Sequence, residues 1–146
     1  MYSNINKDIT PKWFVALVIL LAIWNLLGIG AFVMQVSMTP DKIASLPISE
    51  QALYQNIPSW ANLAFACAVI GGTLGCILLA LKRAISIPIL AISLFGVLTQ
   101  MSHSLFMTNA YEVYGPGGMV MPTLILLVAI FLLYLSLKAK QKKWIK

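Results

Sequence analysis

Polar side chains gather in one stretch of a long apolar segment, and their types are those that could do chemistry. Thr99, Gln100, His103 and Ser104 lie close together inside the segment 85–107. His103 is the only histidine of the chain, and histidine is the side chain that changes charge most readily near neutral pH. If the segment is helical, this spacing puts the four side chains on one side of the helix. The cluster therefore indicates a polar site within an apolar environment.

Three interpretations of His103 are open. A neutral histidine can hydrogen-bond to a neighbouring helix and only hold the helices together. It can instead bind a substrate or handle a proton inside a membrane. A metal site is disfavoured, because no second clear ligand lies near it and no Cys/His spacing typical of metal sites occurs. The sequence therefore predicts neither a metal nor a cofactor.

The composition predicts a single integral membrane domain over residues 1–146. Of the 146 residues, 60% are hydrophobic and only 10% are charged, whereas soluble domains carry about a quarter charged residues. The polar segments are too short to bury a second core. The net charge of +6 comes from basic residues at the chain ends and in one short connection. This distribution is a topology signal, so we expect the lipid bilayer as a partner and no nucleic acid.

Four apolar segments are long enough to cross a bilayer, which takes about 20 helical residues. The expected spans are 13–36, 59–81, 85–107 and 119–137. Short connections join most of them, as an antiparallel bundle requires. The expected fold class is therefore all-α: an antiparallel four-helix transmembrane bundle, with the uniformly apolar fourth span at its periphery.

The first connection, residues 37–58, is expected to form two short surface helices. Thr39-Pro40-Asp41 is a typical helix start, with a capping threonine, a proline in the first turn and an acid near the positive end of the dipole. A second short helix should begin near Ser49 and end before Pro58. The pair would lie on the outer membrane surface or over the mouth of the bundle. It would either cover the bundle passively or gate the entry of a substrate.

Small residues recur every four positions in the second span: Ala64, Ala68, Gly72, Cys76 and Ala80. Residues four apart share one face of a helix. Within lipid, such a face lets two helices approach backbone to backbone. The second span is therefore expected either at the centre of the bundle or at the interface of a homodimer.

Further residues could complete a site around the cluster. Asn25 lies near the middle of the first span, where an unbonded amide is costly, so it should bond to another helix or contact a ligand. Trp24 and Tyr114 carry rings on which a sugar could stack. Glu112 is the only charge of the third connection. It is either a solvated loop acid or a partner for His103 or for a cation.

Basic residues predict the orientation of the spans. The N-terminal segment holds two Lys or Arg residues, the second connection two and the C-terminal tail five. The first connection holds one and the third none. Because Lys and Arg stay on the cytoplasmic side, both termini are expected in the cytoplasm, with the short helices and the tyrosine-containing loop outside.

Several segments carry a resemblance to a known family: Met38-Thr39-Pro40, Leu46-Pro47, Ala52-Leu53-Tyr54, Pro58-Ser59-Trp60-Ala61 and the loop from Asn109 to Gly117. With them the chain resembles, over nearly its whole length, an essentially uncharacterised family of small bacterial four-helix integral membrane proteins. Some of its members are loosely labelled sugar transporters. The resemblance implies a place in the bacterial inner membrane.

Three functions remain open at this point. The first is a transporter or binder of a small polar, sugar-like solute, with its site between the first three spans. Because four spans are too few to enclose a pathway alone, this function predicts a homodimer through the small face of the second span. The second is a structural or accessory subunit whose polar residues only join helices. The third and least favoured is an enzyme acting on a lipid or quinone, with His103 as acid or base.

Overall fold

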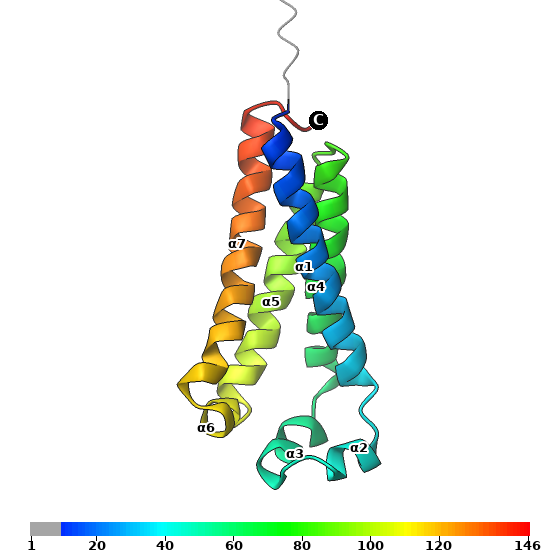
Figure 1. The fold of residues 1–146 in the computed structure, drawn as a ribbon, viewed down its shortest axis with the longest axis vertical. Coiled ribbons are helices and arrows are strands. Elements are labelled where there is room, and N and C mark those ends of the chain that lie inside the picture. The colour runs from blue at the N-terminus through cyan, green and yellow to red at the C-terminus, as the bar shows by residue number, and fades with distance from the viewer. Residues whose placement is uncertain (1–9) are drawn as a thin grey trace, which may run out of the picture.

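A computed structural model describes residues 10–146, in which every regular element is helical (Figure 1). The long helices are α1 (Lys12–Val36), α4 (Ser59–Ala80), α5 (Ser86–Phe106) and α7 (Val120–Gln141). The short elements are α2 (Pro40–Ala44), α3 (Ile48–Gln55), α6 (Ala110–Tyr114) and the 3-10 helix η1 (Pro116–Met119). The described residues thus contain four helices long and apolar enough to cross a membrane. The all-α part of the expected fold class is confirmed.

The two short helices expected between the first and second spans are present as α2 and α3. The Thr39 side chain accepts a hydrogen bond from the Lys42 backbone N–H, and proline occupies the first turn of α2. Gln51 holds the two helices together by donating to the carbonyl oxygens of Ala44 and Leu46. None of the residues of α2, α3 or α6 is buried. These short helices are therefore among the elements least fixed by packing.

Helix α7 is longer than the expected fourth span. It continues past Leu137 to Gln141. Lys138 and Lys140 are exposed and stay helical, since lysine is a good helix former and its long side chain reaches solvent. The apolar segment and the helix therefore end at different residues.

Helix α4 lies at the centre of the fold, packed mainly against α5 and α1, while α7 packs on α5. Four residues of its small face are buried: Ala64, Ala68, Gly72 and Cys76. The fifth, Ala80, is partly buried against the core. A Cβ added at Gly72 would meet the side chains of Asn25 on α1 and Ser93 on α5. The chain's own helices thus fill this face, and the interface predicted through it for a homodimer is not free. A homodimer stays a prediction and would need another surface.

The C-terminus is tied to the connection between α4 and α5. The Ala84 N–H donates to the Lys146 carbonyl oxygen at 2.6 Å, and the Lys146 N–H donates to the Lys82 carbonyl oxygen at 2.8 Å. Ile145, the residue before Lys146, is buried. This end of the molecule, where the C-terminus and the start of α1 meet in Figure 1, is closed by backbone and side chains together.

Aromatic rings complete the closed end. The Trp144 ring lies 5.8 Å from the Trp13 ring and 5.3 Å from the Phe14 ring, measured between centroids. Phe14 is fully buried. The C-terminal segment therefore fastens α1 to α7, although each of these helices packs mainly on another partner.

We expect Trp144→Ala to lower the free energy of unfolding by about 2–3 kcal/mol, less than a fully buried tryptophan, because Trp144 is only partly buried. Thermal denaturation in mild detergent would measure the change. Lys140→Ala is the matched control on an exposed side chain of the same segment and should leave the melting temperature unaltered. Equal losses in the two variants would contradict a role for the indole.

The opposite end is more open. Figure 1 shows α1 and α7 diverging toward the end that carries α2, α3 and α6. Short helices α3 and α6 approach one another there. The bundle is thus closed at one end and only loosely covered at the other.

Candidate functional site

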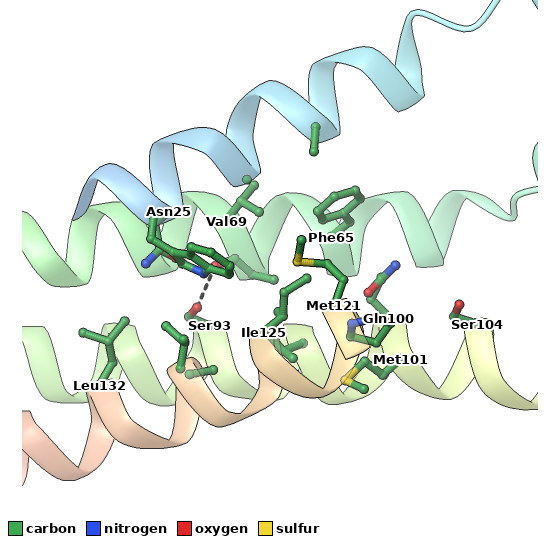
Figure 2. Close-up of a pocket in the computed structure, with 18 of the residues that line it drawn as sticks. Asn25, Phe65, Val69, Ser93, Gln100, Met101, Ser104, Met121, Ile125 and Leu132 are labelled. Carbon is green, nitrogen blue, oxygen red and sulfur yellow. Dashed lines mark hydrogen bonds between the residues drawn. The ribbon is translucent and has the colours of Figure 1, made fainter. Parts of the chain in front are cut away.

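An inner cavity of about 190 Å³ lies among the four long helices (Figure 2). Most of its lining is apolar and includes Phe65, Val69, Met101, Met121, Ile125 and Leu132. Polar side chains line it at two places. Asn25 and Ser93 lie toward the closed end, and Gln100 and Ser104 lie toward the short helices. The inner cavity is therefore an apolar space with a polar mouth.

Asn25 is held by its own helix and by a glycine of the next one. Its Nδ2 donates to the Leu21 carbonyl oxygen at 2.9 Å and lies 3.9 Å from the Cys76 sulfur on α4. Its Oδ1 occupies the space left by the missing side chain of Gly72. Asn25 therefore contacts another helix, as expected. It also lines a cavity, where it could contact a ligand.

An outer chamber of about 150 Å³ lies between the inner cavity and the short helices. Its polar lining residues are Gln35, Gln100, His103, Ser104 and Thr108, and two tyrosines, Tyr54 and Tyr114, face it as well. No Asp, Glu, Lys or Arg of the described residues lines it. Because Gln100 and Ser104 line both spaces, the outer chamber and the inner cavity meet at these two side chains.

Within residues 10–146, the side chains of Gln100, His103 and Ser104 form no hydrogen bond. The side-chain hydrogen bonds of this part of α5, within residues 10–146, come from Thr99, Ser102 and the following Thr108 instead, each to a carbonyl four residues earlier. Partly or fully buried polar groups are usually bonded. The free amide, imidazole and hydroxyl groups are therefore available to water or to a ligand in the outer chamber.

Thr99 does not belong to this group. Its hydroxyl donates to the Phe95 carbonyl oxygen at 2.8 Å, and it lines neither the inner cavity nor the outer chamber. Helical rotation of roughly 100° per residue separates it from Gln100. The placement of Thr99 in the site is therefore not supported by the geometry.

His103 lies between the outer chamber and a wider vestibule. Its ring meets the Trp60 ring edge to face, with centroids 5.3 Å apart, which joins α5 to α4. The vestibule, of about 660 Å³, is lined by His103, Glu112 and residues of α3 and α6. Glu112 is exposed and forms no ion pair with His103 in the described part of the chain. In this structure Glu112 therefore lines the vestibule as an exposed acidic side chain.

Tyr114 faces the outer chamber from the end of α6, opposite Tyr54 of α3. Burial raises the pKa of Tyr114 above its ordinary value, and the nearby Tyr54 and Glu50 raise it further. The phenol therefore stays protonated at neutral pH. It offers the chamber a neutral hydrogen-bond donor on an aromatic ring.

Most of the predicted site residues line two adjoining spaces, whereas Glu112 lines the vestibule and Thr99 lines neither of the two. Trp24 and Asn25 line the inner cavity. His103 and Tyr114 line the outer chamber. Gln100 belongs to both, so the structure joins the predicted residues through it rather than around a single point.

Two interhelical hydrogen bonds come from residues outside the predicted site. Ser93 is buried and donates to the Ala68 carbonyl oxygen at 2.6 Å, which joins α5 to α4. Gln35 donates to Asn62 Oδ1 at 2.8 Å, which joins α1 to α4. Isolated polar residues in apolar spans are the signal that could have singled them out. They perform the helix-joining role that was one interpretation of the cluster on α5.

No protein-family model, curated protein or solved structure matches the chain. The family resemblance seen in the sequence therefore stays a prediction.

Proposed function

We propose that the chain is a multi-pass protein of the bacterial inner membrane that binds a small polar, sugar-like solute in the outer chamber, as a transporter or binding protein. The observation that carries this proposal is the unused hydrogen-bonding capacity of Gln100, His103 and Ser104, which line the chamber. Residues that only join helices would form hydrogen bonds to neighbouring helices, as Gln35 does.

The chemistry of the chamber lining favours an uncharged hydroxylated solute. Amide, imidazole and hydroxyl groups can both donate and accept hydrogen bonds, which matches the hydroxyl groups of a sugar. The two tyrosines add ring surfaces with polar edges. A charged solute would find no side chain of opposite charge among the described residues that line the chamber.

The proposed orientation is an antiparallel transmembrane bundle with both termini in the cytoplasm. Lys82, Arg83 and Lys146 lie together at the closed end, because the backbone of the tail bonds to the α4–α5 connection. Lys7, which also enters the charge count, lies outside the described residues. By the positive-inside rule the closed end is cytoplasmic, and the outer chamber then opens to the periplasm.

Reporter fusions would test this orientation. A fluorescent protein attached after Lys146 is expected to be bright, and alkaline phosphatase at the same place inactive, because only the latter needs the periplasm. Insertion of the two reporters after Ser45, in the connection between α2 and α3, should give the opposite pair of results. Active phosphatase after Lys146 would reverse the orientation and with it the side from which a solute enters.

A thermal-shift screen would test binding itself. Monosaccharides, disaccharides, polyols and amino acids would be added to the purified protein in lipid nanodiscs. A solute at 100 times its dissociation constant should stabilise the folded state by about 2.7 kcal/mol. We expect His103→Ala to reduce this shift at least severalfold, because its ring lines the chamber. Thr99→Ala, on the same helix but bonded to its own backbone, is the matched control and should keep the shift.

A shift that survives in His103→Ala, or no shift with any solute, would contradict this binding site. A loss of melting temperature in His103→Ala without any ligand effect would favour the structural-subunit alternative. That result would assign the ring to its edge-to-face contact with Trp60.

A further inference from the structure

The inner cavity is long and narrow. Along α5 it reaches from Leu90 to Ser104. Fourteen residues of α-helix extend about 21 Å. A volume of about 190 Å³ spread over that length describes a narrow space, which suits an extended chain better than a compact ring system. The shape of the inner cavity therefore differs from what a free sugar would need.

Each space alone is smaller than the site of a drug-sized ligand. Such sites enclose at least about 300 Å³. The outer chamber holds about 150 Å³ and the inner cavity about 190 Å³. Taken as one site joined at Gln100 and Ser104, they reach that range. A ligand that extends through both would use all of the available volume.

The two spaces differ sharply in polarity. The polar groups at the deep end of the inner cavity are already engaged, since Asn25 donates to the Leu21 carbonyl oxygen and Ser93 to the Ala68 carbonyl oxygen. The free polar groups lie at the other end, in the outer chamber. The joined site thus has hydroxyl and amide groups in the outer chamber and an apolar lining in the inner cavity.

The inner cavity also has a side that faces the membrane. Ala31 on α1 and Ile125 on α7 line it and are exposed. α1 packs mainly on α4 and α7 on α5, and the two diverge along this half of the molecule in Figure 1. An apolar chain could therefore enter between them from the bilayer, while its polar end stays near the outer surface.

We infer that the ligand is an uncharged, single-chain amphiphile, with a hydroxylated head in the outer chamber and its apolar chain in the inner cavity. Among residues 10–146, no Asp, Glu, Lys or Arg lines either space. A phosphate or ammonium head would be desolvated there without a partner of opposite charge. The inference rests on the proposed function and deepens it, since the head would occupy the proposed solute site.

Alkyl glucosides of increasing chain length are suitable probes. The protein would be placed in lipid nanodiscs, and methyl, hexyl and octyl β-glucoside would be titrated below their micelle concentrations. Empty nanodiscs would give the partitioning of each probe into lipid, to be subtracted. We expect octyl glucoside to bind at least tenfold more tightly than methyl glucoside after this subtraction.

A variant that fills the inner cavity should remove that advantage. Ala31→Trp places a large ring in the lining and should bring octyl glucoside to the affinity of methyl glucoside, without changing the latter. Val33→Trp is the matched control, since it adds the same ring at an exposed position on α1 outside the cavity lining. If Ala31→Trp does not fold, Ile125→Trp on the facing helix gives the same test.

The possible outcomes separate the two proposals. Equal binding of methyl and octyl glucoside by the native protein would overturn the amphiphile and leave the solute site in place. Binding of octanol as tight as that of octyl glucoside, with none of methyl glucoside, would overturn the head-group site and hence both proposals. Equal competition by a lysophospholipid with a charged head would overturn the inference that the head is uncharged.

Discussion

Gly96→Leu is expected to prevent the native packing of α4 against α5. A Cβ at Gly96 would lie 2.7 Å from the Ala64 carbonyl oxygen and 2.9 Å from the Ala68 backbone nitrogen. Both are backbone atoms of a central helix, so neither can move without displacing that helix. Overpacking of side chains alone costs about 1–3 kcal/mol. With backbone in the way, we expect a loss of about 3 kcal/mol or more in the free energy of unfolding.

Gly30→Leu is the matched control for this prediction. Gly30 also lies in a long apolar helix, but nothing is within 4 Å of a Cβ placed there. Removing a helical glycine should be neutral or stabilise by up to about 1 kcal/mol. Denaturation of both variants in the same detergent measures the difference. Similar melting temperatures for the two would mean that α4 and α5 do not meet at Gly96 as the structure shows.

Local patterns in the sequence were enough to predict the four long helices and the short helices α2 and α3, but α6 and η1 lie in the connection that was predicted as a loop. The capping Thr39 and the apolar segments act within one or two helical turns, and the structure has helices where they indicated them. The small face of α4 was also visible, because its four-residue spacing is local. The helix that packs against it was not visible. Gly96 contacts Ala64 and Ala68 across more than twenty residues of sequence, and one sequence does not indicate which helical faces meet.

The candidate site could be predicted only in part for the same reason. The polar residues on α5 were recognisable from their apolar surroundings. Which of them face the outer chamber depends on how the helix is rotated about its axis, and this rotation turns Thr99 away from the chamber. Tyr54 was recognised as a residue of a short helix, yet its place opposite Tyr114 depends on how α3 approaches α6. The closed end was missed as well. There the chain reverses at Lys143, whose φ of 56° brings Trp144 back onto α1.

Gln100→Leu separates the binding function from the structural alternative. The Gln100 amide lines both the inner cavity and the outer chamber and bonds to nothing in the described residues. Replacing it with an apolar side chain of similar size should weaken solute binding by roughly 10- to 100-fold, as expected for the loss of one or two hydrogen bonds in a desolvated site. Its removal leaves no protein group without a partner. We therefore expect the melting temperature of the empty protein to stay the same or to rise.

Asn62→Leu is the contrasting variant, because the Asn62 amide has a partner. Its Oδ1 accepts a hydrogen bond from Gln35 at 2.8 Å, and interhelical bonds of this kind are worth about 1 kcal/mol in membranes. Asn62→Leu should therefore lower the melting temperature, whereas Gln100→Leu should not. The same replacement of an amide by leucine would then lower the melting temperature at Asn62 and leave it unchanged or raise it at Gln100. If Gln100→Leu instead destabilises the protein as much as Asn62→Leu and no ligand effect accompanies it, the polar residues of α5 hold helices together, and the chain is better described as a structural subunit.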